Sequence, residues 1–213
     1  MRPIPFFGLH EPVSALTHSA AALLALYGLW RLTLKAKGEG LKVGAALLYG
    51  GCLLFLFSMS GVYHSLPPGH GREFFRRLDY MGIWLVIAGS ATPIHLLLMR
   101  GFWRWGMLAV VWAASLASLV VMDLWQKDMS YAAIVAFYAG VASIGLLTFW
   151  RLNRRFSART LFALPLGGLL YISGAVIDAL EGPVLLRGVF GPHELFHLLV
   201  VAGAACHYLF IYG

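Results

Sequence analysis

Charged side chains are scarce in this sequence: Asp, Glu, Lys and Arg together make up 12% of its 213 residues. A water-soluble domain of this size carries about twice that share. Hydrophobic residues account for 60% of the chain, and the mean hydropathy is +0.78. This composition excludes an ordinary soluble domain and predicts an integral membrane protein, organised as a single domain over residues 1–213.

Cysteine is also rare in the chain. Its two cysteines, Cys52 and Cys206, both lie inside apolar runs, which favours small buried side chains over a disulfide. The net charge of +7 does not indicate a nucleic-acid partner, because the basic residues lie in short connectors between apolar segments. In such connectors they set the membrane topology and contact anionic headgroups. Membrane lipids, and no nucleic acid, are the expected partners.

Seven apolar segments are each long enough to cross the ~30 Å hydrocarbon core of a bilayer. The sequence therefore predicts an all-α integral membrane protein with a bundle of seven transmembrane helices. The expected helices cover residues 13–34, 42–63, 78–99, 102–124, 130–150, 160–180 and 192–212.

Seven crossings would bring polar residues that are far apart in the sequence to one edge of the membrane, on the side of the N-terminus. Ionisable groups at membrane depth are costly and therefore indicate function. Two histidines at i and i+4 lie about 6 Å apart on one helix face and can bind one zinc ion, with a third ligand from another helix. A buried metal site is the leading hypothesis. The residues expected at this edge are Glu11, His18, Ser60, His64, Asp79, His193 and His197.

Residues 193–197 read H-E-x-x-H, the signature of zinc metalloproteases, in which the glutamate is the general base. The extended protease pattern requires a histidine six residues after the second one, where this chain has Gly203. His207 lies about 15 Å further along the same helix and cannot reach the same ion. A protease is therefore disfavoured. The plainer interpretation of this pair is two histidines that hydrogen-bond across helices.

The other polar residues each leave an alternative open. Ser60 lies one turn before His64 and is either near the metal site or ordinary polar contact between helices. Asp79 is either an acid at a helix N-terminus, favoured by the dipole and paired with an arginine, or a carboxylate that deprotonates a metal-bound water. Glu11 and His18 share a helix face about 10 Å apart. They would hold the metal ligands in place, form a proton path, or simply pack at the interface.

Five segments of the sequence together resemble one protein family. The segments 59–65 (MSGVYHS), 77–83 (RLDYMGI) and 88–93 (AGSATP), followed by 192–197 (PHELFH) and 205–208 (ACHY), resemble the hemolysin III proteins. These proteins form the bacterial branch of the progestin and adipoQ receptor family. The opening pair of Glu11 and His18 also fits, with Ser14 where the family usually has asparagine. The resemblance covers nearly the whole chain.

The resemblance implies seven helices around a cavity that holds zinc near one membrane face. It implies His64, His193 and His197 as the zinc ligands, with Asp79 positioning a zinc-bound water and Ser60 hydrogen-bonding near it. The wider superfamily includes alkaline ceramidases, which hydrolyse a lipid amide at such a site. A zinc-dependent hydrolase of a lipid amide or ester, serving membrane homeostasis, is the function expected, with a lipid amide or free fatty acid in the cavity.

A second function is a non-catalytic membrane sensor in which zinc links helices structurally. A pore-forming hemolysin is disfavoured, because seven continuous apolar helices are not typical of a secreted pore former. The expected location is the bacterial inner membrane, crossed several times.

The orientation in the membrane is open. The positive-inside rule assigns the more basic side to the cytoplasm, which would place the N-terminus and the metal site outside. The resemblance to the animal receptors of the family implies the opposite, with zinc toward the cytosol. The N-terminal side carries six basic residues: Arg2, Arg72, Arg76, Arg77, Lys127 and Arg187. The other side carries ten: Arg31, Lys35, Lys37, Lys42, Arg100, Arg104, Arg151, Arg154, Arg155 and Arg159.

Overall fold

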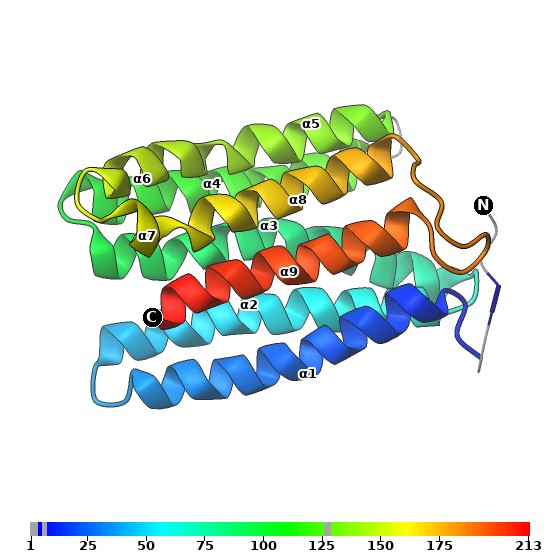
Figure 1. Ribbon diagram of the computed structural model, residues 1–213, viewed down its shortest axis with the longest axis horizontal. Helices are drawn as coiled ribbons and strands as arrows, with labels where there is room; N and C mark the ends of the chain where they lie inside the picture. Colours follow the sequence, from blue (N-terminus) through cyan, green and yellow to red (C-terminus); the bar gives the residue numbers. More distant parts are fainter. Residues whose placement is uncertain (1–3, 6–7, 126–128) are drawn as a thin grey trace. The chain divides into compact units, whose positions relative to one another are not determined.

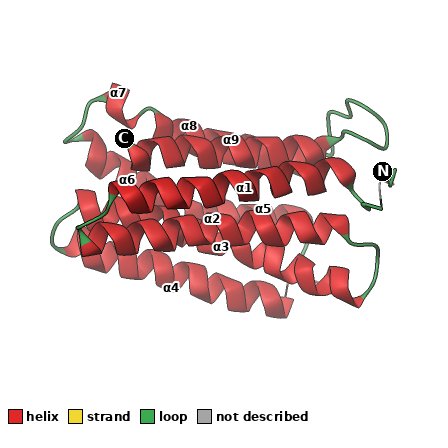
Figure 2. Cartoon of the chain, turned by 90° about the horizontal axis from the view of Figure 1, so that it is seen from below, coloured by secondary structure: helices red, strands yellow, loops and turns green. Residues whose placement is uncertain are grey.

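The computed structural model describes residues 4–5, 8–125 and 129–213. Arg2 and Lys127, which enter the charge count above, lie outside the described residues. The described chain is helical almost throughout, and short loops join its helices (Figures 1 and 2). The described residues contain no β-strand, and an isolated bridge joins Leu186 and Phe190. The predicted all-α class is therefore confirmed.

The chain divides into two compact units, which are described separately. Unit 1 comprises Met1–His18, His64–Pro67 and Asp128–Gly213, and unit 2 comprises Ser19–Tyr63 and Pro68–Lys127. The first turns of one helix and the last residues of another thus belong to unit 1, although the rest of both helices belongs to unit 2. The polar residues near the N-terminus are in this way grouped with the C-terminal helices.

Unit 2 contains most of α1 (Pro12–Lys35) and α2 (Gly40–Ser65), together with α3 (His70–Leu98) and α4 (Phe102–Trp125). Glycines in the left-handed region make its two tight turns: Gly38, with φ of 89°, between α1 and α2, and Gly101, with φ of 57°, between α3 and α4. These turns return the chain at once, so consecutive helices pack antiparallel.

Helix α3 begins at His70, eight residues earlier than the expected start at residue 78. Glu73 is the acidic residue in its first turn, and it accepts hydrogen bonds from the Arg76 side chain at 2.6 and 2.9 Å. Asp79 therefore lies more than two turns into the helix. The helix dipole acts on charges only within the first turn. The interpretation of Asp79 as a dipole-stabilised acid at the helix N-terminus is therefore wrong.

Unit 1 holds the remaining helices: α5 (Tyr131–Ala142), α6 (Ile144–Asn153), α7 (Ala158–Leu161), α8 (Ala163–Ala179) and α9 (Pro192–Tyr212). The single helix expected over residues 130–150 is instead interrupted at residue 143. The Ser143 hydroxyl donates to the Gly140 carbonyl oxygen at 2.6 Å. Such a bond from a serine to a preceding carbonyl competes with the regular helical pattern and bends the helix.

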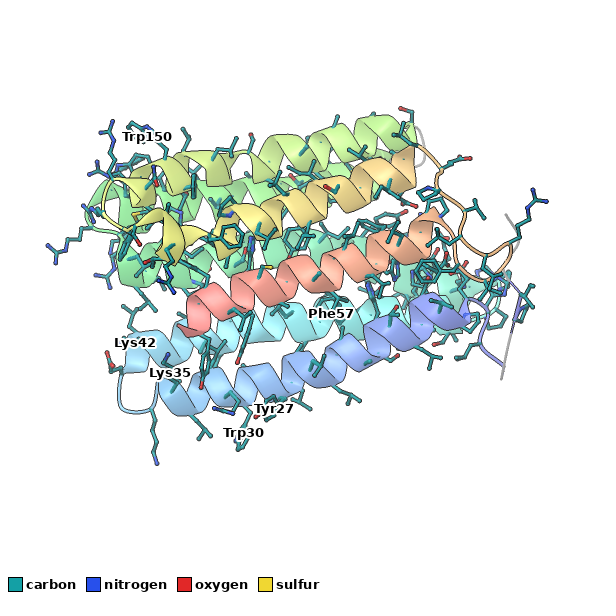
Figure 3. The ribbon with its side chains drawn as sticks, viewed as in Figure 1. Tyr27, Trp30, Lys35, Lys42, Phe57 and Trp150 are labelled. Carbon is teal, nitrogen blue, oxygen red and sulfur yellow. The ribbon has the colours of Figure 1, made fainter. Side chains whose placement is uncertain are left out.

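Six helical stretches are long and apolar enough to cross a membrane, judged by length and composition over the described residues. They are α1, α2, α3, most of α4, α7 continued by α8, and α9. Large apolar side chains are exposed on their outer faces: Leu23 is 71% exposed, and Tyr27 and Trp30 point away from the ribbon of α1 (Figure 3). Such an apolar exterior suits contact with lipid chains. The chain is a multi-pass integral membrane protein.

Helices α8 and α9 pack closely, side by side and in opposite directions (Figure 1). Small residues permit this approach, since a Cβ atom added at Gly203 would lie 3.0 Å from the carbonyl oxygen of Gly167. Moving three turns, about 16 Å, along both helices from this contact brings Asp178 of α8 opposite His193 of α9. The glycine contact therefore sets the register in which these two side chains meet.

Candidate metal centre

The N-terminus of α9 is fixed by its own glutamate. Pro192 occupies the first helical position, where a missing N–H costs nothing. The Gly191 N–H donates to Oε2 of Glu194 at 2.8 Å, as in a capping box. The Ser14 hydroxyl, fully buried, donates to Oε1 of the same carboxylate at 3.2 Å. Both oxygens of Glu194 therefore accept hydrogen bonds, and these bonds fix the position of the first two turns of α9.

Three histidines meet beside this helix start. The Nε2 atoms of His193 and His197 are 3.1 Å apart. The ring of His64, from the end of α2, lies with its centroid 4.6 Å from that of His197 and 5.2 Å from that of His193. One nitrogen from each ring can be chosen so that all three lie within 4.8 Å of one another. These histidines, called the triad below, can hold a metal ion.

Two histidines of the triad are buried, and the third is partly exposed. His64 and His197 are 1% and 2% exposed, whereas the side chain of His193 is 43% exposed. Buried imidazoles are stabilised when their nitrogens have a partner, because an unsatisfied polar atom costs about 1–3 kcal/mol in the interior. An ion at the triad would serve as such a partner and could exchange through the side of His193.

Glu11 contacts the first of these ligands. Its side chain is hydrogen-bonded to Nδ1 of His64, and its backbone N–H donates to the His64 carbonyl oxygen at 3.0 Å. A carboxylate only accepts hydrogen bonds, so Nδ1 of His64 carries the donating hydrogen. The lone pair is then on Nε2, the nitrogen that can coordinate an ion. This arrangement of carboxylate, histidine and metal recurs in protein metal sites.

Asp178 stands in the same relation to a second ligand. Nδ1 of His193 lies 3.3 and 3.4 Å from the two carboxylate oxygens of Asp178, which is 13% exposed. The bond leaves Nε2 of His193 facing Nε2 of His197. The sequence placed Asp178 near the N-terminal side of the membrane, where it would line the same cavity, but did not predict its contact with His193, because that contact depends on the register between α8 and α9. Its position near the end of the helix that precedes the H-E-x-x-H segment was the only available signal.

His18 packs against the third ligand. Its ring is stacked on that of His197, with centroids 3.8 Å apart and planes 18° from parallel. His18 is 3% exposed, so the stack is buried. The face of His18, rather than an edge nitrogen, covers the ring of His197 and limits its rotation. Each histidine of the triad thus has a neighbour that restrains its orientation.

The remaining predicted site residues, Ser60 and Asp79, belong to unit 2. Ser60 is 1% exposed, and its hydroxyl has no hydrogen-bond partner among the described residues. Asp79 is half-buried in α3. The roles expected for both residues stay predictions.

Comparison with known proteins agrees with the resemblance drawn from the motifs. The model of one family, described as haemolysin-III related, matches residues 7–208, which include the whole triad. The chain belongs to the haemolysin-III-related family. A Hemolysin-3 of Bacillus cereus is 27% identical to it over 201 residues, covering 93% of this chain and 89% of that protein. A Hemolysin-3 homolog of Bacillus subtilis is 23% identical over 197 residues, covering 92% and 89%.

Receptors of animals are also similar to this haemolysin-III-related chain. The adiponectin receptor protein of Drosophila melanogaster is 32% identical over 209 residues, which cover 87% of this chain but 45% of the receptor. The similarity is therefore to a part of that longer protein. The bacterial relatives, in contrast, match over nearly their full length.

Proposed function

We propose that this haemolysin-III-related protein binds one zinc ion at His64, His193 and His197 and hydrolyses an amide or ester bond of a membrane lipid. The proposal includes seven membrane crossings, with α5 and α6 together forming the crossing that neither helix is long enough to make alone. It also includes the bacterial inner membrane as the location and membrane homeostasis as the role. The observation that carries it is the triad itself.

The residues of the triad fit zinc. Zn–N bonds of about 2.0–2.1 Å at tetrahedral angles set ligand nitrogens roughly 3.3 Å apart. The Nε2 atoms of His193 and His197 are 3.1 Å apart, close to that spacing. The donor set is also suitable, because neutral imidazoles backed by carboxylates are common zinc ligands. Glu11 and Asp178 provide this backing for two of the three.

A hydrolytic role is favoured over a structural one by the number of ligands. Structural zinc sites are closed by four protein ligands, whereas catalytic sites have three and keep one position open. Among the described residues, the group that could hold a metal ion consists of three histidines. The exposed fraction of His193 leaves one side accessible. A zinc ion bound there would polarise a carbonyl group and lower the pKa of water to about 7.

Other residues would handle the proton and the substrate. We infer that Asp79 accepts the proton of the attacking water and returns it to the leaving nitrogen, as general base and then general acid. The new C–O bond forms as the C–N bond of the amide breaks. Ser60 would donate a hydrogen bond near the reacting group. The support for both roles is the resemblance of the motifs around these residues to the family.

A metalloprotease is disfavoured by the position of Glu194. In the H-E-x-x-H mechanism this glutamate would be the general base. Here its two oxygens accept hydrogen bonds from Gly191 and Ser14. The third member of the histidine group comes from α2 and not from the same helix. The H-E-x-x-H segment would therefore supply two of the three ligands, and the glutamate between them would not be the general base.

Metal analysis tests the proposed site. The protein purified in detergent should contain about one zinc per chain, and His197→Ala should lose it while remaining folded. The matched control is His207→Ala, also on α9, whose Nε2 faces the Leu164 carbonyl oxygen and not the triad. Retention of zinc by His197→Ala would contradict the assignment.

The catalytic step needs a separate test. Zinc-loaded protein should release fatty acid from a lipid amide or ester, and Asp79→Asn should abolish this turnover while leaving the zinc content unchanged. A protein that binds zinc but shows no turnover on either class of lipid would support the non-catalytic sensor. Full turnover in Asp79→Asn would exclude Asp79 as the general base.

A further inference from the structure

A cavity of about 460 Å³ opens in unit 2, at the end of α2 opposite His64. Its volume lies within the ~300–1,000 Å³ range of ligand pockets. The turn between α1 and α2, the end of α3 and the start of α4 form its walls. Figure 3 shows Lys35 and Lys42 on either side of the same α1–α2 turn. None of the predicted metal or catalytic residues lines this cavity.

Positive charge dominates the cavity. Lys42, Arg100 and Arg104 line it, together with one acid, Glu39. Lys42 Nζ lies 2.7 Å from Oε1 of Glu39, so these two charges offset each other. Neither Arg100 nor Arg104 forms a salt bridge with a carboxylate among the described residues. The cavity therefore carries the charge of two unneutralised guanidinium groups.

The surrounding backbone adds to this preference for an anion. Helix α2 begins at Gly40 and helix α4 at Phe102, and both starts lie at the cavity. The first N–H groups of a helix have no acceptor within it, and the helix dipole places partial positive charge there. The Nε atom of Arg104 is buried and has no hydrogen-bond partner in the part of the chain that the structure describes.

The other walls place the cavity at the membrane surface. Leu97 and Met99 line it on the apolar side, and the neighbouring Trp105 and Phe102 are 59% and 67% exposed. Exposed aromatic side chains at helix ends are typical of the level of the lipid headgroups. An anion bound here would thus have apolar chains within reach of Leu97 and charged groups within reach of Arg100 and Arg104.

We propose that this cavity binds the phosphate-bearing headgroup of an anionic phospholipid. Arg104 would supply a fork of N–H donors to the phosphate oxygens, as guanidinium groups do in protein phosphate sites. Arg100 would add a second positive charge at the rim. The lipid chains would leave along the wall formed by Leu97 and Met99. This site is independent of the proposed metal and hydrolase function.

Thermal unfolding of the full chain in a neutral detergent provides the test. Delipidated protein is titrated with phosphatidylglycerol, phosphatidylcholine or inorganic phosphate, since a ligand that binds only the folded state stabilises it by RT ln(1 + L/Kd), where L is the concentration of free ligand. Phosphatidylglycerol should raise the unfolding midpoint increasingly with concentration above its Kd, whereas phosphatidylcholine should raise it little. If inorganic phosphate also raises the unfolding midpoint, the phosphate group suffices for binding. If phosphatidylglycerol raises it and inorganic phosphate does not, the lipid chains are required.

Two double variants, each lacking two positive charges, test whether lipid binding depends on the cavity. Arg100→Gln/Arg104→Gln should raise the apparent Kd for phosphatidylglycerol roughly tenfold or more, because both charge-assisted contacts with the phosphate are lost. The control Arg155→Gln/Arg159→Gln removes two charges from exposed residues outside the cavity and should change it less than about threefold. Arg100→Gln alone, at an exposed residue, keeps the test valid if the double variant is unstable.

Two results would overturn the proposal. Equal losses in the cavity variant and the control would mean that only the overall charge attracts the lipid. Equal stabilisation by phosphatidylglycerol and phosphatidylcholine would mean that the cavity does not recognise a phosphate-bearing anionic headgroup. Arg104→Lys separates charge from geometry, since it should retain part of the affinity but lose the fork of donors.

Discussion

Glu11 holds His64 by two hydrogen bonds, one from Nδ1 of the imidazole to its carboxylate and one from its own backbone N–H to the His64 carbonyl oxygen. The segment that precedes α1 is in this way attached to the end of α2, and the attachment passes through a member of the triad. A substitution of Glu11 should therefore alter the orientation of His64 in the triad more than the stability of the fold.

Replacing Glu11 should weaken metal binding. Glu11→Ala removes the acceptor that orients His64, and carboxylates in this position typically contribute 10- to 100-fold to metal affinity. Glu11→Gln keeps an acceptor oxygen and should fall between this variant and the wild type. Competition with a chromogenic chelator measures the affinity. Glu39→Gln, at an exposed glutamate away from the triad, is the control, and a loss equal to that of Glu11→Ala would count against orientation of His64.

Replacing Asp178 should lower metal affinity less than replacing Glu11 does. The carboxylate oxygens of Asp178 are 3.3 and 3.4 Å from Nδ1 of His193, a longer contact than that of Glu11 with His64. We expect Asp178→Asn to reduce metal affinity by about tenfold or less. The visible absorption of the cobalt-substituted protein should change as the geometry at His193 relaxes. An unchanged spectrum together with unchanged affinity would show that Asp178 does not position this ligand.

Two substitutions of Glu194 distinguish a role in helix capping from a role in catalysis. Glu194→Gln retains a side-chain oxygen that can accept from the Gly191 N–H, so its stability and its lipid turnover should stay close to those of the wild type. Glu194→Ala loses the cap and should be destabilised by about 1 kcal/mol, a fall of roughly 2–4 °C in the unfolding midpoint. Abolished hydrolysis in Glu194→Gln, with zinc still bound, would instead identify Glu194 as a general base.

Reporter fusions test the topology. Seven crossings place the two termini on opposite sides of the membrane, and the excess of basic residues at the α1–α2 and α3–α4 turns assigns that side to the cytoplasm. A fluorophore that matures only in the cytoplasm should fluoresce at the C-terminus and stay dark at the N-terminus. Phosphatase activity from a C-terminal fusion would reverse the orientation. Identical results at both ends would mean that α5 and α6 do not complete a crossing.

Composition and helix spacing predicted the features that depend on local pattern. The all-α membrane class follows from long apolar runs, and the proximity of His193 and His197 follows from their separation of one helical turn. The convergence of His64 on this pair could be anticipated from topology alone, because α2 ends on the side where α9 begins. These features need no knowledge of how one helix is rotated against the next.

The features that the sequence did not reveal depend on contacts that a periodic hydrophobic pattern does not encode. Asp178 meets His193 because Gly167 and Gly203 let α8 and α9 approach at one register. The early start of α3 at His70 extends a helix through charged residues that resemble a connector in composition. The role of Glu194 was hidden by its place in a familiar motif. The first case depends on packing between helices, and the other two involve local contacts, of Arg76 with Glu73 and of the Gly191 N–H with Glu194.

The triad is divided between the second helix of the chain and the last. During synthesis Glu11 and His64, which are 53 residues apart in the sequence, both leave the ribosome before His193 and His197 of α9. A chain that stops before Pro192 holds one of the three ligands. Binding of a metal ion by all three histidines would therefore require a chain that includes α9, so metal content would distinguish such chains from chains truncated before Pro192.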